Sequence, residues 1–389
     1  AAIGFKGHPR RKEGPTFMEG TRPRTVSSIG MFDMLKGAGM LTIVFAHTAE
    51  LYSIPTSGGL SLTAFFPFIY REALMAAFFI ASGYGFRKRS IGKCIQQQLK
   101  TLLKPYLYTA FFTCVLHFFI HYKSFQYLPG TIGESIKVTG GFVLGLPHTA
   151  IYSGQEFFSC GPMWYLLALL TGWIFLDVIL NIFPEPYVPW AVAGCALLGW
   201  GTSLVWKPPF CLVQGAVVVP YLYLGFLAKK HHLLDQPLSP RLRAGLIAAA
   251  ALIAVGSIAT RTTDCISLAE WSLGPVSIFL DGAAGLLFIR LFLRLSRSRG
   301  PVVRFLEAVG RRSLNIFCVH TIELIAIPWY LFVAKFEGRP LLGMWLQYAV
   351  SMGSIWLVCL LLQARRALVI KLFPARRRTP AVQHYTARH

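Results

Sequence analysis

The chain has 389 residues, of which 54% are apolar and only 14% are charged. About a quarter of the residues of a soluble protein are charged, so the composition excludes an ordinary soluble domain and predicts helices that cross a membrane. The apolar runs are long and do not alternate with polar residues, which excludes a membrane β-barrel.

The formal net charge of +22 is high enough to raise the question of nucleic-acid binding. The basic residues, however, cluster in short segments between apolar runs, as in cytoplasmic loops that follow the positive-inside rule. No basic motif interleaved with aromatic residues and no signature of a nucleic-acid-binding fold is present. We therefore predict the lipid bilayer as a partner and no nucleic acid.

Ten apolar segments are predicted to span the membrane, which makes the expected fold an all-α polytopic membrane protein. In chain order they are 31–50, 64–86, 102–121, 162–182, 187–206, 210–228, 244–260, 274–293, 313–333 and 342–363. The fourth and fifth are joined by PEPYVP, whose prolines suit a tight connection between helices.

The distribution of Lys and Arg predicts that both termini are cytoplasmic, because basic residues gather before the first span, in alternate connections and after the tenth span. Residues 1–27 are predicted as a basic cytoplasmic segment that has no apolar core and is no cleavable signal peptide. Residues 28–365 form the predicted transmembrane domain and 366–389 a basic cytoplasmic tail. The external loop at about 122–161 is long enough to be functional or lid-like.

The first predicted span contains the most conspicuous polar residues. Asp33 and Lys36 share one face near its cytoplasmic end, and His47 follows eleven residues after Lys36, close to Glu50. Eleven helical residues cover about 16 Å, roughly half of the hydrocarbon core. Because an ionisable side chain inside a membrane is costly and His transfers protons near neutral pH, His47 is the leading catalytic candidate. The alternative is a histidine that only bonds a neighbouring helix.

The second span adds two groups of charged residues. Arg71 and Glu72 form an unusual pair in its outer part, which either neutralise each other or contact a hydrophilic substrate. A basic run that includes Arg87 and Arg89 follows the small residues of 82–85. It is either ordinary cytoplasmic charge or a binding site for an anionic phosphate.

Later spans contribute two further candidates. Trp164 stands at the external start of the fourth span, where it is either an interface residue or a substrate contact. His320 and Glu323 are three residues apart in the ninth span and so can share a face, either as catalytic partners or as polar contacts between helices.

Metal and disulfide frameworks are not expected, since the eight cysteines are dispersed and form no CxxC pair. No metal site is predicted. The sequence also contains no GxSxG elbow, HExxH motif or P-loop, so it gives no support for a soluble hydrolase or an ATPase.

Four motifs together resemble the acyltransferase-3 family of bacterial integral membrane acyltransferases, in the family's order and over about residues 28–365. They are D-x-x-[RK]-G…H (Asp33, Lys36, Gly37 and His47), F-F-I-x-S-G-Y (78–84, followed by Arg87 and Arg89), P-x-W-[YF]-L (162–166) and S-L-x-I-[YF]-x-x-H (313–320). Lys36 stands where the family has Arg, which keeps the charge but loses the bidentate fork. The branch that acetylates sugars, such as fucose-type polysaccharide O-acetylases, is the most similar.

The resemblance implies transfer of an acyl group, usually acetyl from acetyl-CoA, to a hydroxyl of an extracytoplasmic carbohydrate at a bacterial inner membrane. His47 would then act as general base, with Asp33, Lys36, His320 and Glu323 as further catalytic candidates. Lys36, Arg87 and Arg89 would bind the donor phosphates, and Arg71, Glu72 and Trp164 the acceptor. Acyl-CoA would be a donor substrate, with no permanently bound cofactor.

Two other classes remain open from the residues alone. A transporter or flippase for a glycan or a lipid-linked intermediate also explains polar residues within the membrane and a long external loop. A membrane scaffold or receptor would use the same residues only for packing. The transporter predicts movement of substrate without use of acyl-CoA.

Overall fold

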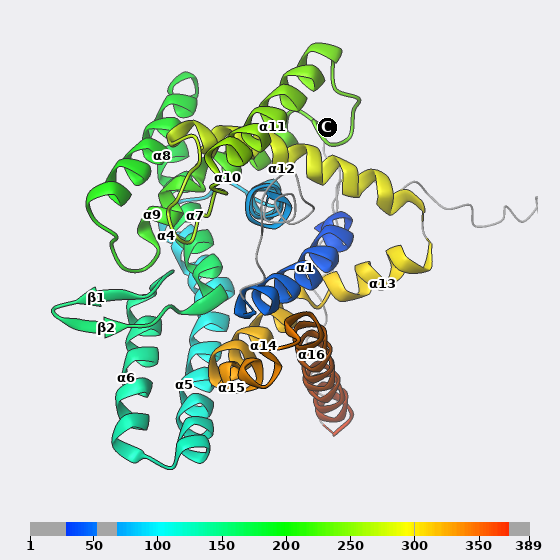
Figure 1. Ribbon diagram of the computed structural model, residues 1–389. Coiled ribbons are helices and arrows are strands. Elements are labelled where there is room, and N and C mark those ends of the chain that lie inside the picture. Colours follow the sequence, from blue (N-terminus) through cyan, green and yellow to red (C-terminus); the bar gives the residue numbers. More distant parts are fainter. Residues whose placement is uncertain (1–28, 53–67, 299, 373–389) are drawn as a thin grey trace, which may run out of the picture.

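The computed structural model describes residues 29–52, 68–298 and 300–372, and within them the chain is helical apart from loops and one two-stranded hairpin (Figure 1). The predicted N-terminal segment 1–27, the start of the second predicted span and the end of the predicted tail lie outside these ranges. The all-α class predicted from the composition is confirmed for the described residues.

The α-helices are, in chain order, α1 (Asp33–Leu51), α3 (Leu74–Tyr84), α4 (Ile91–Gln98), α5 (Lys104–Phe125), α6 (Leu128–Leu144), α7 (Trp164–Ile182), α8 (Val188–Val205), α9 (Leu212–Val217), α10 (Val219–Lys230), α11 (Pro240–Thr260), α12 (Pro275–Leu295), α13 (Pro301–Gly310), α14 (Ser313–Ala326), α15 (Trp329–Val333) and α16 (Pro340–Leu372). Strands β1 (Ala150–Tyr152) and β2 (Gln155–Phe157) pair antiparallel. Short 3-10 helices are Ile29–Phe32, Gly161–Met163, Glu185–Tyr187, Ser296–Ser298 and Ala334–Phe336. Two π-helical turns, Phe68–Ala73 and Leu99–Leu103, lead directly into α3 and α5.

Seven helical segments of the described residues are long and apolar enough to cross a membrane, and a bent pair of helices would make eight. The seven are Ile91–Phe125, Gly161–Ile182, Glu185–Val205, Leu212–Lys230, Pro240–Thr260, Pro275–Ser298 and Pro340–Arg365. The predicted spans at α1 and α3 are helical but fall outside this set. In α1 the polar side chains that carry the candidate chemistry reduce the apolar content. The count of ten spans therefore stays a prediction.

The ninth predicted span, 313–333, is not one straight helix. Its two parts, α14 and the segment Trp329–Phe336, meet at an angle of 70°. Pro328 lies in the break, and Ile327 before it has an extended backbone (φ −92°, ψ 128°). Proline disfavours the helical conformation of the preceding residue and lacks the N–H that would continue the helix. The bend therefore follows directly from the Ile-Pro sequence.

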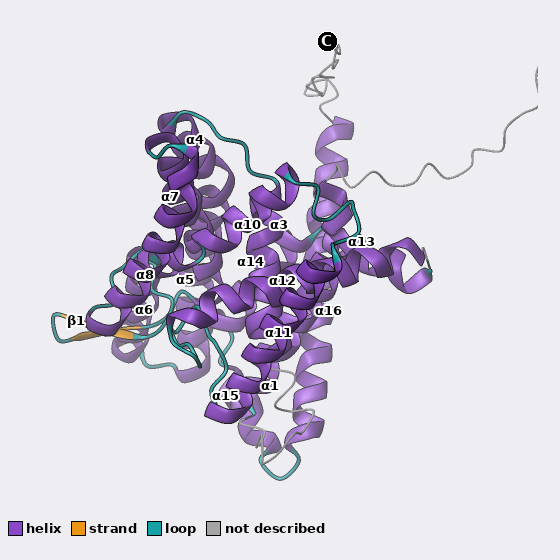
Figure 2. Cartoon of the chain, turned by 90° about the horizontal axis from the view of Figure 1, so that it is seen from above, coloured by secondary structure: helices purple, strands orange, loops and turns teal. Residues whose placement is uncertain are grey.

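The predicted external loop at 122–161 also differs from the structure, because most of it is regular. It contains the end of α5, the whole of α6 and the hairpin of β1 and β2. Pro129 in the first turn and Gly145, whose φ of 58° ends the helix, are the local signals that define α6. In Figure 2 this unit lies on the side of the bundle away from α16.

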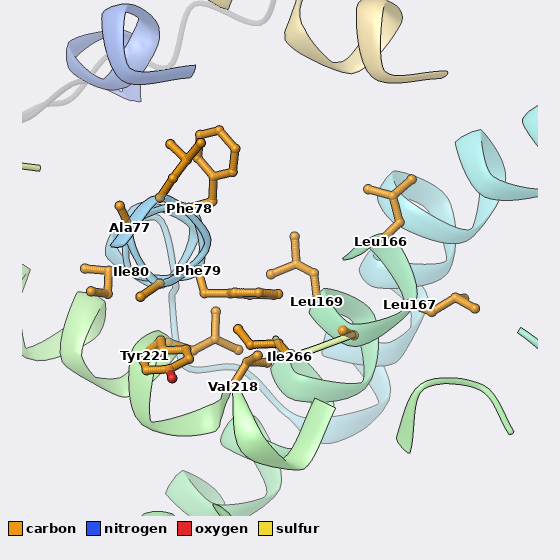
Figure 3. Packing of buried hydrophobic residues seen from close by; sticks show 14 of the residues in the cluster. Ala77, Phe78, Phe79, Ile80, Leu166, Leu167, Leu169, Val218, Tyr221 and Ile266 are labelled. Carbon is orange, nitrogen blue, oxygen red and sulfur yellow. The ribbon is translucent and has the colours of Figure 1, made fainter. Parts of the chain in front are cut away.

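Helix α3 lies at the centre of the protein, packed between α10 and α12. Most of its residues are buried and apolar around the full circumference, which is typical of a helix without a solvent-facing side. Figure 3 shows Phe79 pointing from α3 toward Leu169 of α7, while Phe78 points in another direction, away from Val218 and Tyr221. The core thus packs α3 against α7 and α10.

Glycine allows α1 and α13 to approach each other at backbone distance. A Cβ atom on Gly37 of α1 would stand 1.9 Å from the carbonyl oxygen of Leu306 in α13, and one on Gly310 would stand 1.8 Å from that of Asp33. Such close approach is a known use of small residues between membrane helices. The glycine that follows Lys36 therefore has a structural reason, which is the backbone of α13.

Candidate active site

A cavity of about 650 Å³ lies along α1 and is lined by several further segments of the chain. Three polar residues of α1, Lys36, His47 and Glu50, all line it. Lys36 and Glu50 are fourteen residues apart on one helix, which is about 21 Å at 1.5 Å per residue. The cavity therefore extends about 21 Å along α1, a length comparable with a bilayer core of about 30 Å.

At one end of the cavity His47 is held by a carboxylate. Its Nδ1 lies 3.3 Å from Oε2 of Glu50, and the guanidinium of Arg71 donates to the other oxygen, Oε1, at 2.9 Å. Arg71 also donates to the hydroxyl of Thr263 at 3.4 Å. With an ionised Glu50, Nδ1 carries the proton and Nε2 keeps its lone pair. This is the tautomer that a general base requires.

Arg71 binds Glu50 and also lies in electrostatic contact with Glu72, so mutual neutralisation of Arg71 and Glu72 stays a prediction. Both residues lie on the π-helical turn Phe68–Ala73. Consecutive helical residues point about 100° apart, so Arg71 faces the cavity and Glu72 faces the interior. Glu72 is 1% exposed and does not line the cavity. Direct contact between Glu72 and a substrate is therefore not favoured by its position.

A second histidine lies behind the first. The ring of His320 is 5.7 Å from that of His47 between centroids, and its Nδ1 lies 3.2 Å from Oε2 of Glu323. The hydroxyl of Ser351 donates to Glu323 Oε1 at 2.7 Å. His320 is buried, lies outside the cavity wall, and its Nε2 has no hydrogen-bond partner within the described residues. His320 thus packs against His47 and does not itself line the cavity.

The opposite end of the cavity is defined by Lys36. Its ammonium lies 3.4 Å from the carboxylate of Asp33, which does not line the cavity. Ser313, the first residue of α14, also lines this end. The free N–H groups at the start of a helix favour an anion. Lys36 and the start of α14 together suit a negatively charged group.

The remaining predicted residues divide into two groups. Trp164 lines the cavity, as the sequence suggested. Arg87 and Arg89 do not, because the chain turns onto α7 after Gly85. There the N–H of Arg89 donates to the Asp177 carboxylate at 3.1 Å. A role for these two arginines in donor binding stays a prediction.

Several residues of the site were missed because their partners are distant in sequence. Ser351 is 28 residues from Glu323, and Thr263 is 192 residues from Arg71. No role was predicted for residues 265–268, which line the cavity from the loop between α11 and α12. No group of three metal-binding side chains is found in the part of the chain that the structure describes.

The fold and the cavity together define a helical membrane protein whose interior holds a carboxylate-bound histidine beside a space large enough for a substrate. The family model of an acyltransferase domain, Acyl_transf_3, matches residues 29–364, and the chain therefore belongs to the acyltransferase-3 family. It is a membrane acyltransferase. No curated protein and no solved structure matches the chain significantly.

Proposed function

We propose that this protein transfers an acetyl group from acetyl-CoA to a hydroxyl of an extracytoplasmic carbohydrate, at the inner membrane of a bacterium. The observation that carries the proposal is that Lys36 and His47 line one cavity from the same helix. An anion-binding end and a proton-accepting end are thereby joined by a continuous space. The excess of Lys and Arg beside the Lys36 end supports a cytoplasmic location for the donor.

The middle of the cavity suits the uncharged arm of the donor. Its wall there is formed by apolar side chains that include Met40, Ile43 and Leu169. The phosphates of acetyl-CoA would remain near Lys36, where a cation lowers the free energy of an anion. The thioester would then reach the half of α1 that carries His47. The acceptor would enter from the end formed by Glu50, Arg71 and Trp164.

The reaction proceeds by general base catalysis. Nε2 of His47 takes the proton of the acceptor hydroxyl while its oxygen attacks the thioester carbonyl carbon. The C–S bond breaks, and the thiolate takes the proton back from the imidazolium. The products are an O-acetyl ester and free CoA, so no other reactant is needed. Glu50 stabilises the imidazolium and fixes the ring, while His320 and Glu323 limit its movement from behind.

The proposal is tested with purified protein in nanodiscs and radiolabelled acetyl-CoA. Acceptor probes are the methyl glycosides of glucose, galactose and fucose, together with cell-envelope glycans of the native organism. Alkali-labile label on a glycan is the expected result, since an O-acetyl ester is cleaved by base. Absence of acetyl-CoA turnover with all these acceptors would contradict the proposal and favour the transporter.

Donor binding gives a separate prediction. Replacement of Lys36 by alanine is expected to raise the KM for acetyl-CoA about tenfold, because one charge-assisted contact with phosphate is lost. Lys36→Arg should keep most of the affinity. Steady-state kinetics at saturating acceptor measure both, with Lys123→Ala, an exposed lysine at the end of α5, as control.

The double variant Arg87→Ala plus Arg89→Ala tests whether the basic run after α3 also binds the donor nucleotide. A higher KM for acetyl-CoA is expected if the two side chains extend the phosphate site beyond the cavity. An unchanged donor response would remove both arginines from the site and leave Lys36 as the cation that the donor meets.

A further inference from the structure

The loop between α11 and α12 forms part of the cavity wall. Residues 265–268 line the cavity together with His47 and Trp164. The side chain of Ile266 also reaches the core beside Val218 and Tyr221 (Figure 3). Because residues 265–268 belong both to the core and to the cavity wall, they form a fixed surface. The acceptor would meet this surface at the His47 end of the cavity.

The main chain of this loop is held from several directions. The N–H of Asp264 donates to Glu72 Oε1 at 2.9 Å, and Gln214 Nε2 donates to the carbonyl of Ser267 at 3.1 Å. The ammonium of Lys207 donates to the carbonyl of Leu268 at 3.3 Å. Because these bonds hold the backbone, the side chains of the wall can differ in size without loss of the loop conformation.

Among the groups that hold this loop, the buried carboxyl of Glu72 has the highest free-energy cost of burial. Its carboxylate is buried, accepts from Ser257 at 2.7 Å as well as from Asp264, and lies in electrostatic contact with the buried carboxyl of Asp281. Apolar side chains of similar volume would usually pack at least as stably as buried charged groups. The role of Glu72 is therefore better explained by the position in which it holds the loop than by a contribution to the free energy of unfolding.

The same π-helical turn also positions the catalytic histidine. Arg71 holds Glu50, which in turn holds His47, while the next residue, Glu72, holds Asp264. The distance between His47 and the loop is therefore set through two adjacent residues. π-turns of this kind are frequent at functional sites.

We propose that residues 265–268 are the wall that selects the acceptor, and that Glu72 is the positioning residue that holds this wall in register with His47. This inference rests on the proposed function. The wall presents the apolar side chains of Ile266 and Leu268 and the hydroxyl of Ser267, which bonds the Cys265 thiol at 3.2 Å, and the indole of Trp164 lines the same cavity. This combination suits an uncharged sugar ring with an apolar face and hydroxyl edges.

The position of the loop is measured through Cys265, a native free thiol in the cavity wall. The rate of its reaction with N-ethylmaleimide is followed by peptide mass spectrometry in nanodiscs. Glu72→Ala is expected to raise this rate about tenfold, because the loop loses the hydrogen bond from the Asp264 N–H to the Glu72 carboxyl oxygen. Glu72→Gln keeps the accepting oxygen and should restore the wild-type rate. Glu337→Gln, an identical change on an exposed residue outside this loop, is the matched control.

Selectivity is measured with Leu268→Ala and the glycan probe that receives label from the wild type. The KM for this acceptor is expected to change at least threefold while the KM for acetyl-CoA stays the same. Equal changes in both KM values would overturn the inference, as would unchanged Cys265 labelling in Glu72→Ala. If Glu72→Ala does not fold, the KM values of Leu268→Ala for the acceptor and for acetyl-CoA decide whether the inference holds. Failure of the wild type to use acetyl-CoA would instead contradict the proposed function.

Discussion

Replacement of His47 by alanine is expected to lower the rate of acetyl transfer by about a thousandfold, within the range of roughly 10² to 10⁴ that a general base contributes. His47 lines the cavity, and its Nδ1 is held by Glu50 at 3.3 Å, so in the proposed reaction Nε2 takes the acceptor proton. Transfer of labelled acetyl groups in nanodiscs, normalised to the amount of folded protein, measures the effect.

His232→Ala is the matched control for this variant. His232 forms the same kind of contact, with Asp235 three residues later at 3.1 Å, but lies exposed in the connection between α10 and α11. It should leave the rate unchanged. Full activity of His47→Ala would remove His47 from the chemistry. Glu50→Gln should show an intermediate loss, since the ring keeps a hydrogen-bond partner but the imidazolium loses a negative charge.

Replacement of Gly37 by alanine is expected to destabilise the protein by about 3 kcal/mol, the upper part of the usual range for overpacking. The added Cβ would stand 1.9 Å from the carbonyl oxygen of Leu306, and a backbone atom cannot move aside like the end of a flexible side chain. Alanine alone would favour the helix by about 1 kcal/mol, so a loss of stability reports the contact of α1 with α13.

Thermal unfolding in nanodiscs, followed by tryptophan fluorescence, measures this change. Gly133→Ala is the control, because Gly133 also lies inside a helix, α6, but no atom lies within 4 Å of the place that an added Cβ would occupy. Its melting temperature should stay the same or rise. A Gly37→Ala protein as stable as the wild type would show that α13 does not approach α1 as closely as described.

The helical character and the family were predictable from the sequence because both depend on local patterns. The predicted first and fourth spans, 31–50 and 162–182, agree closely with α1 (Asp33–Leu51) and α7 (Trp164–Ile182). Long apolar runs specify such helices almost independently of their neighbours. The motif around Lys36 and His47 was likewise visible, since both residues lie on one helix.

The partners of these residues were not predictable in the same way. Glu50 was noted only as a neighbour of His47, while its bond to Arg71 depends on how the π-helical turn packs against α1. The contact of Glu72 with Asp264 joins residues 192 positions apart. Such pairs follow from the packing of helices, for which a single sequence contains no direct signal.

The common location of Lys36 and His47 on α1 has a consequence for how this chain can vary in length. One residue inserted between them would rotate His47 by about 100° around the helix axis and shift it by about 1.5 Å. The histidine would then leave the cavity, and Glu50, which rotates with it, would lose its contact with Arg71, even though every side chain was still present. Apart from glycines such as Gly37, the ten intervening residues can therefore change more readily in identity than in number, unlike the connections between helices that do not line the cavity.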